Sequence, residues 1–452
     1  METNKIVAGI ELSSSKAIGV LAEKTSNKSF KIIAYKEVDS SHCIKRGVIY
    51  NYDDTTNLIK SIIEELENQS NLEVEKVYTS IAGLSLKGKR NTVREVFDEE
   101  KIITEDVVER LQNQNISRDF GDYSVIEVKP QEYTVGIKKQ ANPIGISSKS
   151  IEGDFLNIVA KEKLSSSLEH CFNRSGVELE EMVLTPVSVA DITLTDEEKA
   201  LGCALIDFGA DTTTITVYKN GILRHIAVIP LGSNNITKDI ASTNISQKEA
   251  ERIKREKIDL RYQEDDYNQE FLSTQNEGDL IRLNDIAYSR CEEIVENAWA
   301  QIRYTGLENN LIEGIVIIGG GANIKNLDSL INKTTGIQKI RFAKETNISV
   351  EDTNNNIAKD GRFHTILSII ANGNTMCCKP MQEEVKETPT DLFGEDENII
   401  EQEKLAKKRQ EEEKKKAKEE NKQGGDKPKK EGNSLTKKFS GFIDGLFKDE
   451  EN

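Results

Sequence analysis

The chain has 452 residues, enough for the cores of about two to four domains, and its formal net charge is −17. Because like charges repel, this acidic balance excludes a general affinity of the whole surface for nucleic acid or anionic lipid. The six cysteines form no CxxC pair and no metal-type spacing with the four histidines, so we expect the reduced, buried thiols of a cytosolic protein.

The chain begins with METNKIVAGIELSSS, whose apolar run is too short for a signal peptide and is typical of a strand. No segment has the roughly 18 apolar residues that a membrane span needs. We therefore expect a cytoplasmic body whose contact with a membrane could only be peripheral.

Strand-like and helix-like runs alternate as far as about Lys379. Runs typical of buried strands are KIVAGIEL (5–12), KVYTSIAGL (76–84), CALIDFGA (203–210), TTITVY (213–218) and GIVIIGGGA (314–322). Runs typical of amphipathic helices are LIKSIIEELENQ (58–69), FLNIVAKEKLSSSLEHCFNRSG (155–176) and DIAYSRCEEIVENAWAQIRYTG (285–306). This alternation predicts α/β layers with mostly parallel sheets.

Two hairpins of small residues can each approach a phosphate. In GIELSSSKAIGVLAE (9–23) a strand reverses through three serines, whose hydroxyls and backbone N–H groups suit a phosphate. In ALIDFGADTTTITVYKNG (204–221) a strand ends at Asp207, and a carboxylate beside such a turn suits hydrated Mg²⁺. For each hairpin taken alone, an ordinary tight turn is the alternative.

A third segment, IVIIGGGANIKNLDSLI (315–331), joins a hydrophobic strand to three glycines and a helix whose predicted first turn includes Ala322 and Asn323. The glycines allow close backbone approach to the sugar and α-phosphate of a nucleotide, although the segment is neither a GxGxxG fingerprint nor a P-loop. In order and spacing, the three segments together resemble the actin–Hsp70–sugar kinase superfamily, in which two related α/β domains clamp ATP in a central cleft.

Further segments resemble the bacterial cell-division family FtsA. They are SHCIKRGVIYNYDD (41–54), KVYTSIAGLSLKGKRNTVREV (76–96), VIEVKPQEYTVGIKKQANPIGISSKSIEGDFLNIVA (125–160), GILRHIAVIPLGSNNITKDIA (221–241) and ISQKEAERIKREKI (245–258). The third of them resembles the insert of that family, which actin, Hsp70 and sugar kinases lack. The resemblance covers roughly residues 5–378 and the extreme C-terminus. It implies an α/β, actin-like two-domain fold of ribonuclease H-like sheets flanked by helices, with an FtsA-type insert subdomain and a disordered C-terminal tail.

The implied domains follow one another along the chain. They are the first part of the domain 1 core (1–84), the insert (85–162), the second part of that core (163–203), the first part of the domain 2 core (204–235), a small subdomain and candidate FtsZ-binding region (236–308), the second part of the domain 2 core (309–360), a return helix (361–380), a flexible linker rich in Lys and Glu (381–433) and an amphipathic membrane-targeting helix (434–448).

By motif, the resemblance implies a set of residues that bind ATP with Mg²⁺, with Asp207 as the candidate metal residue. The set is Ser13, Ser14 and Lys16 in the first turn; Asp207, Gly209, Ala210, Asp211 and Thr212 in the second; Gly232, Ser233 and Asn234 after the domain-crossing strand; Glu251 and Lys254 bordering the adenosine; and Gly319, Gly320, Gly321 and Ala322 on its other side. Glu251 and Lys254 are three positions apart on one helical face, so both can reach one ligand; a surface ion pair is the alternative.

The second turn departs from the pattern of the family. Ala210 and Asp211 replace glycines, and Thr214 stands where a second carboxylate is common. The missing carboxylate predicts slow or absent hydrolysis of ATP. Asp211 places negative charge near the phosphates unless Mg²⁺ or Lys16 compensates.

The last segment, LTKKFSGFIDGLFKDEEN (435–452), places its apolar residues within an arc of roughly 140° on a helix. These residues are Leu435, Phe439, Phe442, Ile443, Leu446 and Phe447. The acidic end offsets three lysines, so we predict weak membrane binding by apolar insertion, strengthened when several tails act on one polymer. The resemblance implies a membrane anchor; docking on the body or on a partner is the alternative.

As a whole, the resemblance implies a protein that polymerises and tethers FtsZ to the inner face of the cytoplasmic membrane at the division septum. The implied partners are the FtsZ C-terminal peptide, other copies of the chain, other division proteins and the membrane surface, without nucleic acid. Arg290 and Arg303 are candidate contacts for the acidic FtsZ peptide, and a solvated helix face is the alternative for both. The alternative functions are a pilus-assembly adaptor of the same superfamily and a small-molecule kinase, for which the sequence offers no clear catalytic Asp loop.

Overall fold

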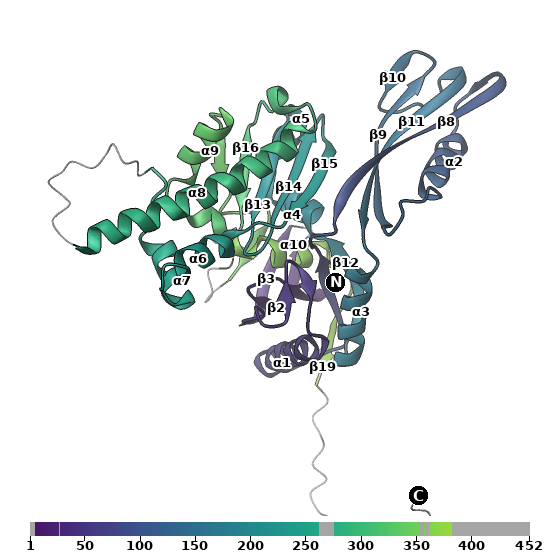
Figure 1. Ribbon diagram of the computed structural model, residues 1–452. Coiled ribbons are helices and arrows are strands. Elements are labelled where there is room, and N and C mark those ends of the chain that lie inside the picture. The colour runs from purple at the N-terminus through teal and green to yellow at the C-terminus, as the bar shows by residue number, and fades with distance from the viewer. Residues whose placement is uncertain (1–4, 27, 262–274, 353–356, 358–360, 382–452) are drawn as a thin grey trace, which may run out of the picture. The chain divides into compact units, whose positions relative to one another are not determined.

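The structure is a computed structural model that describes residues 5–26, 28–261, 275–352, 357 and 361–381 (Figure 1). The expected linker beyond Met381 and the expected terminal helix, with its six apolar membrane residues, lie outside the described residues. The domain boundaries expected from the sequence stay predictions.

The first sheet has six strands in the order β12-β7-β1-β2-β3-β18. The bounds of these strands are β1 (Lys5–Leu12), β2 (Ala17–Ser26), β3 (Ser29–Val38), β7 (Lys76–Ile81), β12 (Glu178–Leu184) and β18 (Ser349–Glu351). Helices cover both faces of this sheet. On one face Gly19 lies against Ile62 of α1 (Tyr52–Ser70), and on the other face Gly9 lies against Ile369 of α10 (His364–Asn372). α3 (Lys163–Ser175) packs beside α1, and α4 (Thr185–Thr193) packs beside α10 (Figure 1). Burial on both faces explains why β1 and β2 are almost continuously apolar.

Helix α1 shows how local sequence sets the bounds of an element. Asn51 caps its start, since the side chain accepts hydrogen bonds from the backbone N–H groups of Asp53 and Asp54. The apolar residues recur at helical spacing, and the stripe that includes Ile59 and Ile62 is fully buried. The helix ends at Ser70, and the capping residue Asn71 adopts the left-handed conformation with φ 58°.

The second sheet has nine strands in the order β10-β9-β11-β8-β15-β14-β13-β16-β17. The bounds are β8 (Lys87–Ile102), β9 (Ser124–Val135), β10 (Lys138–Gln140), β11 (Ser147–Ala160), β13 (Cys203–Phe208), β14 (Thr213–Lys219), β15 (Ile222–Ile229), β16 (Ile315–Ile318) and β17 (Ile340–Phe342). The α-helices not yet named are α2 (Glu105–Ile116), α5 (Asp196–Leu201), α6 (Ser233–Ala241), α7 (Gln247–Glu256), α8 (Gln275–Arg303) and α9 (Leu327–Thr335). Two further sheets have two short strands each. One pairs β4 (Ile44–Lys45) with β5 (Val48–Ile49), and the other pairs β6 (Leu72–Val74) with β19 (Cys378–Pro380).

Two expectations about these elements are wrong. The sheets are mixed rather than mostly parallel, because short turns such as Asn220–Gly221, both with positive φ, join neighbouring strands into antiparallel hairpins. The helix expected over 155–176 begins only at Lys163, because Phe155–Ala160 is the end of strand β11 and lies between β8 and β9.

The region expected to form the insert, residues 85–162, has an apolar cluster of its own. Helix α2 covers one face of the insert strands, as Figure 1 shows. The cluster contains Phe97, Ile103, Val107, Leu111, Tyr133, Val135, Ile151 and Phe155. The insert thus has the apolar burial that a small subdomain needs.

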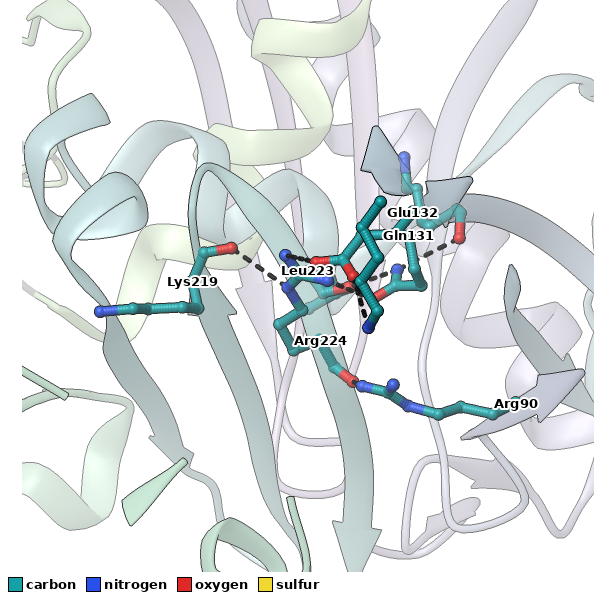
Figure 2. Close-up of polar contacts among 8 residues, drawn as sticks. Arg90, Gln131, Glu132, Lys219, Leu223 and Arg224 are labelled. Carbon is teal, nitrogen blue, oxygen red and sulfur yellow. Dashed lines mark hydrogen bonds and ion pairs between the residues drawn. The ribbon is translucent and has the colours of Figure 1, made fainter. Parts of the chain in front are cut away.

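A polar network joins the insert to the second core through β15 (Figure 2). The strand pairing between β15 and β8 at this point contains the single register pair Ala227–Lys87. A shift in the pairing of β9 with β11 places Gln131 in a bulge, and its Nε2 donates to the carbonyl of Leu223 at 2.9 Å. Arg224 is buried, and its guanidinium lies 3.5 Å from a carboxylate oxygen of Glu132. These contacts anchor the insert where its backbone pairing is shortest.

Candidate functional site

A cleft of about 1050 Å³ lies where the three glycine- and serine-rich turns meet. The predicted residues that line it are Ser13, Ser14, Lys16, Asp207, Gly209, Ala210, Asp211, Thr212, Ser233, Asn234, Glu251, Lys254, Gly319 and Gly320. Residues more than 300 positions apart in the chain therefore converge on one cavity.

Three predicted residues lie behind this lining. Gly232 supports the second turn, since a Cβ added there would lie 2.6 Å from the backbone carbon of Ala210. Gly321 is buried against the ring of Phe208, and Ala322 packs against the second apolar core. Their predicted role in nucleotide binding stays a prediction.

The first two turns are short hairpins closed by their own hydrogen bonds. In the first, the backbone N–H of Ser13 donates to the carbonyl of Lys16 at 3.1 Å; in the second, the N–H of Gly209 donates to the carbonyl of Thr212 at 3.0 Å. Both hairpins connect antiparallel strands, as the sequence predicts. Small residues leave the backbone of each turn accessible from the cleft.

The third turn differs from its prediction. After β16 the glycines form a 3₁₀ helix, Gly320–Asn323, and the α-helix α9 begins only at Leu327. Gly319 has φ 88° and lies close to the second turn, where an added Cβ would be 2.6 Å from the carbonyl oxygen of Phe208. Glycine is thus required here both by conformation and by space.

Two carboxylates line the cleft, the buried Glu11 and the half-buried Asp207, and the sequence pattern indicates only Asp207. Burial raises the pKa of Glu11 to about 7, although Lys16 and a hydrogen bond from Ser13 oppose the shift. Burial also raises the pKa of Asp207 to about 6. Glu11 could have been noticed as a carboxylate within the apolar strand KIVAGIEL, where an unpaired charge is costly.

This pair of carboxylates fits Mg²⁺. One oxygen of Glu11, Oε2, is buried without a hydrogen-bond partner among the described residues. Oxygen donors are the ligands that Mg²⁺ prefers, and the ion usually keeps several waters and takes only one or two carboxylates from a protein. The described residues contain no group of three or more His, Cys, Asp or Glu side chains arranged to hold a metal, so water and phosphate would complete the coordination.

Glu251 and Lys254 line the cleft but also bind each other. Their charged atoms are 2.7 Å apart, and Lys254 Nζ donates to the carbonyl of Ser233 and to Thr237 Oγ1 at 3.2 and 3.0 Å. Burial would raise the pKa of Glu251, but Lys254, Thr237 and Arg255 together hold it below its ordinary value. The two side chains therefore form the ion pair that the sequence offers as the alternative. The pair is not a surface pair as expected, because Lys254 is buried.

The remaining predicted cations have protein partners or lie outside the cleft. Lys16 Nζ donates to the carbonyl of Arg362 at 3.0 Å and lies 4.3 Å from the ring centre of Phe363. On α8, Arg290 pairs with Asp239 of α6, whereas Arg303 is exposed. The ion pair holds Arg290 against the protein itself.

Comparison with solved structures identifies the fold class. The structure described as "PilM-PilN type IV pilus biogenesis complex" matches 81% of this chain and 97% of that chain with a TM-score of 0.56 and 14% sequence identity. At this identity the match shows the fold alone. With its two sheets flanked by helices and three turns around one cleft, the chain has an actin-like α/β fold, as the sequence predicts.

The family follows from sequence. The family model of "Cell division protein FtsA" matches residues 204–368. The FtsA protein of Borreliella burgdorferi is 30% identical over 342 residues, covering 73% of this chain and 83% of the relative. The FtsA protein of Porphyromonas gingivalis is 27% identical over 343 residues, covering 74% and 71%. The chain belongs to the FtsA family of cell-division proteins, which confirms the resemblance.

Proposed function

We propose that the chain binds ATP with Mg²⁺ in this cleft, self-associates, and tethers FtsZ to the inner face of the cytoplasmic membrane at the septum. The observation that carries the nucleotide part is the convergence on one cavity of three turns of small residues and two carboxylates, Glu11 and Asp207, whose pKa values are raised. Membership of the FtsA family supports the role in division.

Each part of the cleft has a task in this proposal. The backbone N–H groups and hydroxyls of the first two turns receive the phosphates, because such concave turns present several donors to one anion. Glu11 and Asp207 would hold a hydrated Mg²⁺, which when bound would supply positive charge to the phosphates. Thr214 lines the cleft but cannot act as a carboxylate base, so we expect slow or absent hydrolysis.

Thermal unfolding with and without nucleotide tests this part. We expect ATP with Mg²⁺ to raise the melting temperature of the native chain, and Asp207→Asn to lose most of that shift. Asp122→Asn is the matched control, since Asp122 is exposed and does not line the cleft. A native chain that shows no shift at millimolar ATP would refute nucleotide binding, whereas rapid ATP hydrolysis would refute only the slow turnover.

The membrane role rests on the sequence of residues 435–447 and on family membership. Among the described helices, none is long and apolar enough to cross a membrane. Peripheral attachment is tested by pelleting the full chain with liposomes beside a chain truncated after Gly432. We expect only the full chain to pellet, Phe442→Glu with Phe447→Glu to abolish pelleting, and doubled salt to change it little. Equal pelleting of the full and truncated chains would refute the anchor.

Co-sedimentation with FtsZ on liposomes separates the division role from the alternatives. A pilus-assembly adaptor of the same fold, or a small-molecule kinase, would not bring FtsZ into the pellet. We expect FtsZ in the pellet only when the full chain is present. The small subdomain expected at 236–308 remains our candidate for the FtsZ contact, and the exposed Arg303 is one of its candidate basic contacts.

A further inference from the structure

The tip of one small hairpin contacts both hairpin turns of the cleft. The hairpin of β4 and β5 turns through Arg46 and Gly47, which both have positive φ, 52° and 70°. The backbone N–H of Gly47 donates to Ser14 Oγ at 2.9 Å, and the adjacent N–H of Arg46 donates to a carboxylate oxygen of Asp211 at 3.2 Å. Two neighbouring amides thus connect the turn of the first sheet with the turn of the second.

Both oxygens of the Asp211 carboxylate are engaged. The other oxygen accepts a hydrogen bond from Asn234 Nδ2 at 2.8 Å, and the backbone N–H of Asn234 donates to the carbonyl of Ala210 at 2.8 Å. The carboxylate is therefore held in one orientation beside the second turn, where it lines the cleft.

The position of Asp211 matters for the phosphates of the proposed nucleotide. If the nucleoside lies between α7 and the glycines after β16, its phosphates would extend toward the first two turns, and the last phosphate would lie nearest the hairpin tip that contacts both turns. A like charge within a few ångströms in a partly buried cleft disfavours an anion, here by about tenfold. A diphosphate lacks the terminal group and avoids this repulsion. Lys16 also lines the cleft, but its ammonium is bonded to the carbonyl of Arg362.

We propose that Asp211 determines phosphate specificity: it lowers the preference for nucleoside triphosphate over diphosphate, and a bound triphosphate breaks the contact between Asp211 and Arg46. The proposal rests on the proposed nucleotide binding in this cleft. The β4–β5 hairpin is then bonded to Asp211 when a diphosphate is bound and released from Asp211 when a triphosphate is bound.

Affinities for ADP and for a non-hydrolysable ATP analogue, measured by calorimetry with excess Mg²⁺, test the specificity. Asp211→Asn removes the charge but keeps an oxygen that can accept from Arg46, and Asp211→Glu keeps the charge. We expect Asp211→Asn to shift the ratio of the two affinities about tenfold toward the triphosphate, and Asp211→Glu and the exposed control Asp122→Asn to leave the ratio as in the native chain. A ratio in Asp211→Asn within twofold of the native value would overturn the inference. Failure of the native chain to bind either nucleotide would instead overturn the proposed function.

Hydrogen exchange of the native chain tests the hairpin without any substitution. We expect the peptide that contains Arg46 and Gly47 to exchange faster with the triphosphate analogue than with ADP, because the Arg46 amide loses its acceptor. Equal exchange with both nucleotides at saturation would overturn the proposed release of the hairpin, even where the affinity ratio behaves as expected.

Discussion

The substitution Lys254→Met tests whether the buried ion pair of α7 holds the helices beside the cleft together. The side chain of Lys254 is 6% exposed, and that of its partner Glu251 is 31% exposed. Methionine keeps most of the apolar stem but removes the ammonium group. We expect a clear loss in the free energy of unfolding of the second core.

The magnitude follows from the contacts of the ammonium group. Removing one partner of a buried ion pair costs about 3–5 kcal/mol when the other charge is left without compensation. Here Glu251 keeps Arg255 at 2.7 Å and the hydroxyl of Thr237 at 2.6 Å, so part of its charge stays compensated. The carbonyl of Ser233 and Thr237 Oγ1 each lose a donor. We therefore expect a loss of about 2–3 kcal/mol, below the uncompensated range.

Fluorescence of Trp299, the single tryptophan of the chain, measures this loss during denaturation. Trp299 lies on α8 and packs against the second apolar core, so its emission reports on the relevant part of the molecule. The control is Arg252→Met on the same helix, where the ion pairs with Glu249 and Glu256 are exposed and their loss should not change stability measurably. Equal stability of Lys254→Met and Arg252→Met would refute the reasoning.

Three further predictions concern the cleft and the insert. Because burial raises the pKa of Glu11 from 4.5 to about 7 and of Asp207 from 3.8 to about 6, the folded chain holds protons that the unfolded chain has lost. Stability without added Mg²⁺ should therefore fall from about pH 4 to about pH 7, less steeply in Glu11→Gln by denaturant titration. Gly232→Ala should lower the melting temperature and weaken the ATP-induced shift, because its Cβ would lie within 2.6 Å of the second turn; an unchanged shift would contradict this packing. Arg224→Met removes the contacts of the guanidinium with Gln131 and Glu132 (Figure 2) and should speed hydrogen exchange at the base of the insert, whereas Lys139→Met, at an exposed ion pair, should not; equal exchange would contradict the anchoring role.

Much of the fold could be predicted because it depends on local patterns. The strands β1, β13, β14 and β16 coincide with apolar runs bounded by small residues. Phe155–Ala160 was misassigned because it is a continuous apolar run, without the alternation of a half-buried strand, directly before a true amphipathic helix. Its strand partners, Val125–Pro130 and Lys87–Asn91, lie far away in sequence, and local periodicity cannot report them.

The site was predictable to the extent that single turns carry its chemistry. Each turn is encoded by small residues at a strand end, so its position could be read from one segment. The burial of Lys254 could not be predicted from one segment, because its acceptors Ser233 and Thr237 lie 21 and 17 positions earlier, on another helix. The link between Asp211 and Arg46 spans 165 positions and involves a backbone amide, for which no residue type is diagnostic.

The charges of the cleft differ in how much they can gain from a ligand. Lys254, Lys16 and Asp211 all have internal polar partners, so a nucleotide that contacts them exchanges one interaction for another. Glu11 and Asp207 are different, because burial already opposes their charged forms. A divalent cation bound there would stabilise the charged forms of both carboxylates, and its binding would release the protons that they hold below about pH 6 to 7. Affinity for Mg²⁺ together with nucleotide should consequently rise with pH through this range, and a nucleotide without Mg²⁺ should bind weakly, since its phosphates would meet carboxylates that no cation compensates.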